Sequence, residues 1–450
     1  MRHYFRHIAL LFAFGMSLVT LAQTTQWRDI YTAKKKDTIY GIARKYNITV
    51  DELVEANPAM KGDDYKLKKG ETVFIPFEKT KADLEAEQQK SSPRTDVRQR
   101  AIKVGVMLPL HNVDGDGRRM VEYYRGMLMA CDSLRRAGIS ADIHAWNVSI
   151  DADIRQTLIQ NAASECDIIF GPLYTKQVKP LAEFCRTYDI KMVIPFSIGG
   201  DDVNHYPQIF QVYQDTEHQT QDAVNAFMER FPNNHVVFID CNDSTSRKGI
   251  FTTALRKQLE EKKLSYNITN LNTADDLFQK AFNRSKTNVV VINTGRSPEL
   301  NQTLAKLDRL RSRDAGVALA LYGYTDWLMY TKVYADYFHR YDTYIPTNFY
   351  YNAGSKSTQA LEQNYKKWFN QDMQYALPRF AITGYDHAQY FLRGLHQYGT
   401  DFKGTKQQRV STPMQTPLYF KPAAAGGGMQ NSQFMLVHYK PNKTIEAINY

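Results

Sequence analysis

Short apolar runs alternate with amphipathic segments between residues 102 and 321, and this alternation restricts the fold more than any other feature. The apolar runs predict buried strands at 102–108, 141–148, 167–170, 191–194, 209–212, 236–239, 265–271, 289–292 and 317–321. The segments between them predict helices, for example at 119–137, 178–188, 217–231, 249–262 and 299–311. Strands that alternate with helices form parallel sheets, which bind ligands at the carboxyl ends of their strands. The sequence therefore predicts an α/β fold.

The strand series is interrupted at residues 213–216 and then starts again, and a late helix at Phe380 to Tyr398 is expected to return to the first half. This order resembles the type I periplasmic-binding-protein fold, as in leucine/isoleucine/valine-binding proteins. The segments that carry the resemblance are Lys103 to Leu110, Ile168 to Tyr174, Met192 to Ser197, Ile209 to Tyr213 and Thr383 to Asp386. The resemblance implies two lobes with a parallel sheet in each, lobe one at about 101–213 plus 346–410 and lobe two at about 214–345.

A different pattern occupies residues 27–77. Asp37 or Thr38 is expected to cap a first helix, and Thr49 with Glu52 forms a capping box for a second. Strands are expected before and after the helices, which gives a β-α-α-β unit. The unit resembles a LysM domain, and the matching residues are Lys35, Asp37, Thr38, Ile39, Ile42, Ala43, Tyr46, Leu53, Asn57, Leu67, Gly70, Ile75 and Pro76.

The LysM resemblance implies a shallow groove for N-acetylglucosamine polymers, and hence peptidoglycan as a partner. Carried over to this chain, the groove walls are residues 36–39 and 59–67. The candidate glycan-binding residues are Lys36, Asp37, Thr38, Ile39, Met60 and Leu67. Lys36 departs from the family pattern, which usually has glycine before the aspartate. A LysM fold without measurable glycan affinity is the alternative.

The periplasmic-binding-protein resemblance implies a small polar solute held between the lobes, which close by a hinge motion. In amino-acid-binding members of the family, which serve ABC transporters, lobe one holds the carboxylate of the solute, and an acid and a tyrosine of lobe two hold its ammonium. The candidate cleft residues are Leu110, Tyr174, Thr175, Ser197, Ile198, Tyr324 and Asp326. Turn chemistry at the strand ends, without a ligand, explains these residues equally well.

A second function remains open, because the resemblance extends to outer-membrane activators of peptidoglycan synthases, which contain degenerate domains of this fold and act through protein contacts. The chain would then be a LysM-localised interaction protein that regulates envelope machinery through contacts with a protein partner. A collapsed or tyrosine-filled cleft would favour this reading, and a cleft with convergent polar groups would favour solute binding.

The first 22 residues have the pattern of a cleaved secretory signal peptide, with a basic start, an apolar stretch at 8–21 and a small residue, Ala22, at its end. An uncleaved anchor is the alternative. No other stretch approaches the ~20 apolar residues that a spanning helix needs. We therefore expect a protein of the periplasm or cell envelope without a membrane-spanning segment. Residues 78–100 predict a charged linker, with a helix at 82–89.

The net charge of +10 comes from 57 basic and 47 acidic residues that are scattered along the chain. A soluble protein near anionic polymers has such a balance, but no basic stripe indicates a nucleic-acid partner. No catalytic motif is found, and Asn112 to Gly117 resembles a calcium loop with a misplaced glutamate. We therefore expect no enzyme, cofactor or metal site.

Four cysteines, Cys131, Cys166, Cys185 and Cys241, lie in apolar or amphipathic segments without the spacing of a zinc site. They are expected as disulfides or as buried free thiols. Residues 411–450 predict one C-terminal hairpin, with strands at 413–420 and 434–439 around the glycine-rich segment 423–428.

Overall fold

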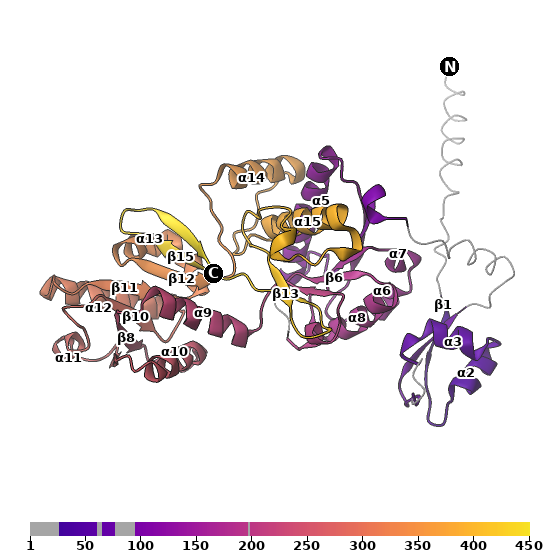
Figure 1. The fold of residues 1–450 in the computed structure, drawn as a ribbon, viewed down its shortest axis with the longest axis horizontal. Helices are drawn as coiled ribbons and strands as arrows, with labels where there is room; N and C mark the ends of the chain where they lie inside the picture. The colour runs from indigo at the N-terminus through magenta and orange to yellow at the C-terminus, as the bar shows by residue number, and fades with distance from the viewer. Residues whose placement is uncertain (1–26, 61–64, 77–94, 197–198) are drawn as a thin grey trace, which may run out of the picture. The chain divides into compact units, whose positions relative to one another are not determined.

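The computed structural model describes residues 27–60, 65–76, 95–196 and 199–450. Contacts between residues divide the chain into two compact units. One contains an N-terminal module at residues 27–76, and the other contains two lobes (Figure 1). The expected signal peptide and the expected helix at 82–89 lie outside the described residues.

The N-terminal module is the predicted β-α-α-β unit. Strand β1 (Trp27–Thr32) pairs antiparallel with β2 (Thr72–Pro76), and helices α2 (Ile39–Tyr46) and α3 (Val50–Ala56) lie between them in the chain. Thr38 caps α2, because its hydroxyl accepts a hydrogen bond from Gly41 N at 3.0 Å. The capping box of Thr49 and Glu52 at the start of α3 is confirmed. The buried core of the module is formed by Ala33, Ile42, Ala43, Ile48, Leu53, Met60, Val73 and Ile75.

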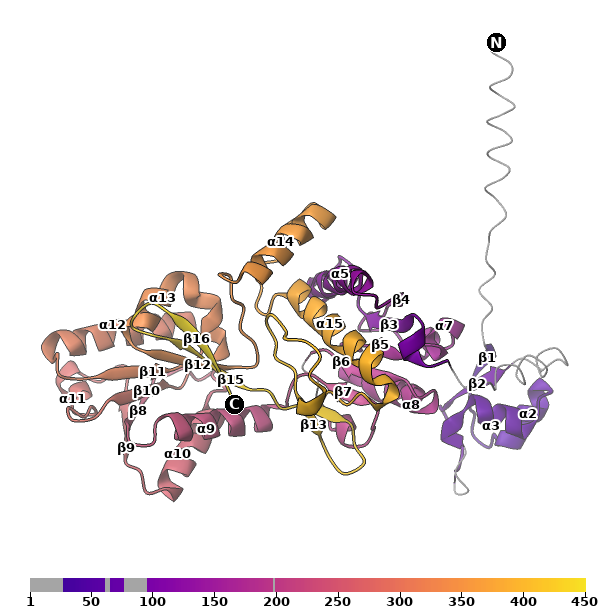
Figure 2. The ribbon, with the colours of Figure 1, turned by 45° about the horizontal axis from the view of Figure 1, so that its top comes forward.

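Lobe one contains a seven-stranded sheet with the order β13-β14-β7-β6-β5-β3-β4. Its central strands are parallel, and their bounds are β3 (Ile102–Leu108), β4 (Ala141–Asn147), β5 (Ile168–Phe170), β6 (Lys191–Ile194) and β7 (Ile209–Gln211). The helices of this part of the chain are α5 (Gly115–Arg136), α6 (Arg155–Leu158), α7 (Asn161–Ser164), α8 (Val178–Thr187) and the late helix α15 (Phe380–Tyr398). Helices α5 and α15 cover one face of the sheet and α8 the other (Figure 2).

Helix α15 returns to lobe one as predicted, and it crosses α5 at two glycines. A Cβ atom at Gly126 would lie 1.8 Å from the carbonyl oxygen of Ala381, and one at Gly384 would lie 2.0 Å from that of Tyr123. Only glycine allows two helix backbones to approach this closely. Helix α14 (Lys356–Phe369) packs on both helices through Leu361 and Tyr365.

Lobe two contains a second seven-stranded sheet, with the order β16-β15-β12-β11-β10-β8-β9. Its parallel strands are β8 (His235–Asp240), β9 (Tyr266–Asn270), β10 (Asn288–Ile292), β11 (Leu319–Tyr322) and β12 (Thr343–Thr347). The helices are α9 (Thr216–Arg230), α10 (Gly249–Glu261), α11 (Asp275–Gln279), α12 (Ser297–Arg313) and α13 (Thr331–Arg340). Helices α12 and α13 lie on one face and α9 and α10 on the other (Figure 2).

The C-terminal tail contributes strands to both sheets, so the prediction of one hairpin is wrong. Strand β13 (Phe420–Pro422) pairs with β14 (Met429–Asn431) around the glycine-rich segment, and β14 pairs parallel with β7 of lobe one. Strand β15 (Met435–Tyr439) instead pairs antiparallel with β12 of lobe two, and β16 (Ile445–Asn449) pairs with β15. All of β15 is buried, because it lies between two strands of that sheet. Its true neighbour, β12, was not predicted from the sequence.

The side chain of Asp386, on α15, holds the tail to lobe one. Its carboxylate accepts hydrogen bonds from the backbone N–H groups of Met414 and Gln415, each at 2.8 Å, and of Thr416 at 3.4 Å. Burial raises the pKa of Asp386 to about 7, although the three backbone N–H groups act in the opposite direction. The tail therefore passes from lobe one to lobe two at a fixed point.

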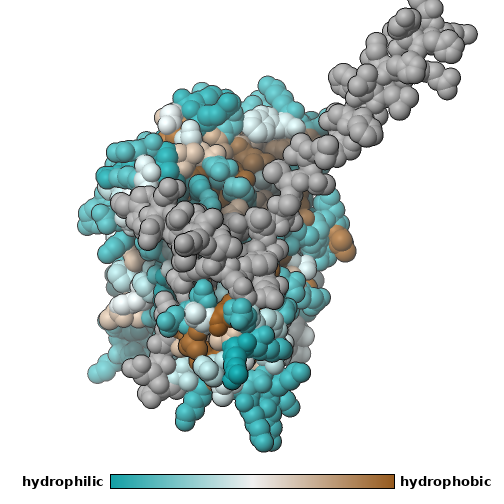
Figure 3. Space-filling view, turned by 90° about the vertical axis from the view of Figure 1, so that its right-hand side faces the viewer, coloured by the Kyte–Doolittle hydropathy of each residue, from teal (hydrophilic) through white to brown (hydrophobic). Residues whose placement is uncertain are grey.

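All four cysteines are free thiols, of which Cys131 is half-buried and the other three are buried. Within the described ranges, no helix has the length and apolar character to cross a membrane, and no group of histidines, cysteines and acids could hold a metal ion. The face shown in Figure 3 is mainly hydrophilic, with small hydrophobic patches between polar side chains.

Candidate functional site

The first wall of the predicted glycan groove is a tight turn between β1 and α2. Asp37 N donates to the carbonyl oxygen of Lys34 at 3.2 Å. The Asp37 carboxylate accepts bonds from Lys34 N and from the Tyr31 hydroxyl, each at 2.7 Å. These two donors lower the pKa of Asp37. Asp37 and Thr38 therefore shape the wall through bonds inside the module.

The apolar candidates of the groove differ in exposure. Met60 is only 6% exposed and belongs to the core of the module. Ile39 and Leu67 are half-buried and pack against the same core. Residues 61–64 of the second wall lie outside the described residues. The structure thus leaves Ile39 and Leu67 with more surface to offer a sugar face than Met60 has.

Asn57, one of the residues that match the LysM pattern, joins α3 to β2. Its side-chain amide donates to the carbonyl oxygens of Leu53 and Phe74, and its side-chain oxygen accepts from Phe74 N, all at 2.8 Å. A buried amide with all of these bonds satisfied fixes the strand against the helix. The only signal in the sequence was the position of Asn57 in the LysM pattern.

In lobe one, three candidates follow strand ends. Leu110 N donates to the Asn147 side chain at 2.8 Å, and the hydroxyl of Thr175 accepts from Gly199 N at 3.2 Å. The hydroxyl of Tyr174 lies 3.4 Å from the carboxylate of Asp116. Ser197 and Ile198 lie outside the described residues.

The charge near Tyr174 is negative. Partial burial raises the pKa of Tyr174 to about 12, and the charges of Asp116 and Asp114 contribute to the shift. Asp114 caps α5, since its carboxylate accepts from Gly117 N at 2.7 Å. The segment that resembles a calcium loop is therefore the start of a helix.

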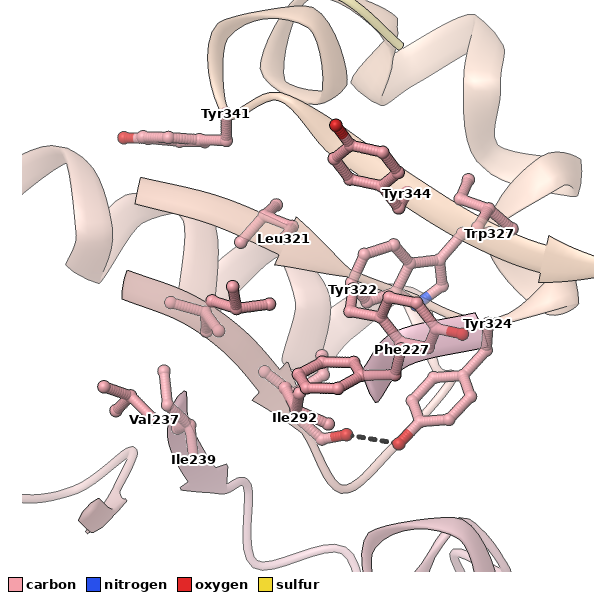
Figure 4. Close-up of a cluster of buried hydrophobic side chains, with 14 of the residues drawn as sticks. Phe227, Val237, Ile239, Ile292, Leu321, Tyr322, Tyr324, Trp327, Tyr341 and Tyr344 are labelled. Carbon is pink, nitrogen blue, oxygen red and sulfur yellow. Dashed lines mark hydrogen bonds between the residues drawn. The ribbon is translucent and has the colours of Figure 1, made fainter. Parts of the chain in front are cut away.

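In lobe two, Tyr324 is part of the core. It is 6% exposed, and its hydroxyl donates to the carbonyl oxygen of Ile292 at 2.6 Å (Figure 4). Its ring makes edge contacts with Phe251 and Trp327. Asp326 is exposed, and its carboxylate pairs with the Lys248 ammonium at 2.7 Å. That ammonium also lies 4.9 Å from the centre of the Tyr324 ring.

Charged residues that the sequence reasoning missed lie beside this pair. The carboxylate of Asp243 accepts hydrogen bonds from Thr245 and Thr294, which lower its pKa to about 2, and it lies 3.6 Å from the guanidinium of Arg296. Asp243 and Lys248 follow β8, and Arg296 follows β10. The rule that ligands bind at carboxyl ends of parallel strands would have selected them.

The structure brings Tyr324, Asp326 and Lys248 together at the carboxyl end of the lobe-two sheet, and Tyr174 and Thr175 together at the corresponding end of the lobe-one sheet. At these two sheet edges the side chains carry hydroxyls, carboxylates and one ammonium. Such groups orient a polar solute by hydrogen bonds and ion pairs.

Two family models match the sequence. The LysM domain model matches residues 31–76, and the periplasmic binding protein model matches residues 139–429, which is more than half of the chain. No curated protein matches the chain.

Solved structures resemble the chain at low sequence identity. A putative branched-chain amino acid ABC transporter from Rhodospirillum rubrum is 14% identical, with a TM-score of 0.52 over 78% of this chain and 100% of that one. The substrate binding protein LivJ from Streptococcus pneumoniae, in complex with isoleucine, is 14% identical, with a TM-score of 0.42 over 78% and 100%. LpoA from Haemophilus influenzae is also 14% identical, with a TM-score of 0.47 over 78% of this chain and 59% of that one. At such identity the first of these similarities supports the fold alone.

Proposed function

The chain belongs to the periplasmic binding protein family, and we propose that it is an exported envelope protein that holds peptidoglycan through its LysM domain and binds a small polar solute between its two lobes. LysM and periplasmic binding protein domains are typical of the envelope or periplasm, and both are binding domains. The signal-peptide pattern of residues 1–22 supports export.

Solute binding is supported by one observation above all: polar side chains follow the carboxyl ends of strands in both sheets. Tyr174 and Thr175 follow β5, and Asp326 follows β11. Parallel sheets bind ligands at these ends. We propose an amino-acid-like solute whose carboxylate is held in lobe one by Thr175 and not by Tyr174, beside which the charge is negative. Leu110, Ser197 and Ile198 stay candidates from the sequence alone.

The ammonium of such a solute would compete with the ammonium of Lys248 for the carboxylate of Asp326. Asp326 pairs with Lys248 at 2.7 Å, so a solute ammonium must displace Lys248 from that carboxylate. The Tyr324 hydroxyl is engaged by Ile292, and we assign this tyrosine the role of supporting the edge on which Asp326 lies.

Cosedimentation with insoluble peptidoglycan tests the first half of the proposal. The mature protein is compared with a variant from which residues up to Phe77 are deleted. We expect only the intact protein to pellet, because the proposed groove for N-acetylglucosamine polymers belongs to the deleted module. Equal pelleting of both proteins, or of neither, would contradict LysM-mediated attachment.

Thermal unfolding with a panel of amino acids and related solutes tests the second half. A solute at 100 times its Kd stabilises the folded state by ~2.7 kcal/mol. We expect at least one solute to raise the melting temperature, and Thr175→Ala to reduce that rise. Lys257→Gln, on the exposed surface of α10, is the matched control and should leave it unchanged. If no solute raises the melting temperature, the cleft does not bind this class of ligand.

A second function, regulation of envelope machinery through a protein partner, is favoured by the internal pairing in lobe two. Both the Tyr324 hydroxyl and the Asp326 carboxylate have partners within the lobe. Small-angle X-ray scattering separates the two functions, because a solute-binding protein contracts as its lobes close. An interaction protein with an empty cleft would keep the same radius of gyration at every solute concentration.

A further inference from the structure

The LysM domain contains the same turn twice. The sequence Tyr-Thr-Ala-Lys-Lys-Lys-Asp at 31–37 is repeated as Tyr-Lys-Leu-Lys-Lys-Gly-Glu at 65–71. In each turn the tyrosine hydroxyl donates to the carboxylate six residues later, Tyr31 to Asp37 and Tyr65 to Glu71. The same carboxylate accepts from the backbone N–H three residues earlier, at 2.7 Å in the first turn and 2.8 Å in the second.

The two turns lie side by side at one end of the two-stranded sheet. Gly70 N donates to the carbonyl oxygen of Ala33, and Ala33 N donates to that of Glu71, both at 2.8 Å. Six lysines, which we call the lysine cluster, are exposed on these turns: Lys34, Lys35, Lys36, Lys66, Lys68 and Lys69. None of them forms an ion pair with a described residue. The two carboxylates within the turns are half-buried and bonded to tyrosine and backbone groups, so the cluster keeps a net positive charge.

Lys36 occupies the one position in the first turn where glycine would be less strained. Its φ is 80°, and the φ of Gly70 at the equivalent position of the second turn is 87°. This left-handed conformation is strained for a residue with a Cβ atom and free of that strain for glycine. The stability of the turn alone would thus favour glycine at both positions. A strained residue of this kind points to a role for its side chain.

We propose that the lysine cluster binds the carboxylates of the peptides that peptidoglycan strands carry, beside the groove that holds the sugars. This proposal rests on the proposed attachment of the LysM domain to peptidoglycan. Thr38 and Ile39, which belong to the groove wall, directly follow Lys36 and Asp37 in the chain. An anion held by the cluster therefore lies next to the glycan. Polymers of N-acetylglucosamine alone lack such carboxylates, and the cluster would add affinity only for peptide-bearing strands.

The test measures binding of the full mature chain to three insoluble walls at low and high salt. The first wall is peptidoglycan treated with hydrogen fluoride, which removes phosphodiester-linked polymers (the peptide-bearing wall). The second is the same material after an amidase has removed the peptides and a carbodiimide with ammonia has converted the carboxylates left on N-acetylmuramic acid to amides (the stripped wall). The third is untreated wall. The variant is Lys35→Gln/Lys36→Gln/Lys69→Gln. The matched control removes the same charge from the exposed surface of lobe two by Lys257→Gln/Lys262→Gln/Lys286→Gln.

We expect the wild type and the control to bind the peptide-bearing wall roughly fivefold more tightly than the stripped wall at low salt, and the preference to fall at high salt, as for several weak exposed ion pairs. The cluster variant should bind both walls equally and as tightly as the wild type binds the stripped wall. The variant Lys36→Gly should lose part of the preference without loss of folding.

Three results would overturn the proposal. Equal binding of the variant and the wild type to the peptide-bearing wall would exclude the lysines. If the wild type binds the untreated wall more tightly than the stripped wall, and this difference disappears after hydrogen fluoride treatment, the cluster binds phosphate groups instead of peptide carboxylates. A preference lost in the lobe-two control as well would show an effect of net charge alone. Failure of the wild type to bind any of the walls would instead refute the proposed attachment to peptidoglycan, on which this inference rests.

Discussion

Removal of the Asp386 carboxylate should destabilise the two-lobed domain strongly, because this one side chain holds three backbone N–H groups of the tail. In the variant Asp386→Ala, the N–H groups of Met414, Gln415 and Thr416 lose their acceptor. Gln415 and Thr416 are 2% and 1% exposed, so water cannot replace the carboxylate at these two positions.

The magnitude follows from the cost of leaving buried donors unpaired, which is about 1–3 kcal/mol for each group. With two fully buried donors, Asp386→Ala should lower the free energy of unfolding by roughly 2–6 kcal/mol. Asp386→Asn keeps one carbonyl oxygen as an acceptor but turns an amide N–H₂ group toward other donors. The free energy of unfolding of Asp386→Asn should therefore lie between those of the wild type and the alanine variant.

Differential scanning calorimetry and guanidinium titration of the mature protein measure the change. Asp372→Ala is the matched control, since this aspartate is 78% exposed and its ion pair among the described residues is with Lys366 on the surface. The control should change the free energy of unfolding by less than about 0.5 kcal/mol. A loss below about 1 kcal/mol in Asp386→Ala, similar to that of the control, would refute the reasoning that the carboxylate supports the tail.

Three further predictions concern the pH dependence at Asp386 and substitutions of Lys36 and Tyr324. Because the folded-state pKa of Asp386 is about 7 and thus above its unfolded value, its contribution to stability is present at acidic pH and is lost as the pH rises toward 7 and beyond. Unfolding titrations from pH 5 to pH 8 should therefore show wild-type stability falling relative to Asp386→Asn, and parallel curves would contradict this. Lys36→Gly should stabilise the LysM domain by ~0.5–1 kcal/mol through relief of strain, measured by hydrogen exchange of its buried amides; slower exchange is expected, and faster exchange would exclude strain. Tyr324→Phe should cost ~1 kcal/mol through loss of the bond to Ile292 while solute affinity stays unchanged; a weaker solute effect on the melting temperature would place the hydroxyl in the ligand site.

The parallel sheets could be predicted from the sequence because their strands are continuous apolar runs. Strand β10 (Asn288–Ile292), for example, is buried throughout and contains three consecutive valines. Strand β12 (Thr343–Thr347) is equally buried but consists of Thr-Tyr-Ile-Pro-Thr, so its composition does not indicate a core strand. Its place is decided by partners on either side, β11 and β15, and β15 lies far away in the chain. The prediction of a single C-terminal hairpin was wrong for the same reason, because the partner strands of the tail lie far away in the sequence.

Hydrogen bonds between residues close in sequence could be predicted, and partners distant in sequence could not. The capping box of Thr49 and Glu52 depends on residues three apart, and the sequence alone predicts it. The bond of the Tyr324 hydroxyl to Ile292 joins residues 32 positions apart, and the pair of Lys248 and Asp326 joins residues 78 positions apart. Position at a strand end could therefore suggest these residues, but it could not say that they are partners within the lobe.

The division of the tail between the two sheets has a consequence for the order in which the chain can fold. Lobe one pairs β7 with β14, and lobe two pairs β12 with β15. Neither sheet can be completed before residues 429–439 have been synthesised, so a ribosome-bound chain that ends earlier lacks strands of both. Pairing of strands this distant in sequence is slow, because a long loop must close first. A chain that cannot complete either sheet during synthesis stays unfolded for longer. Passage through a narrow translocation pore requires an unfolded chain.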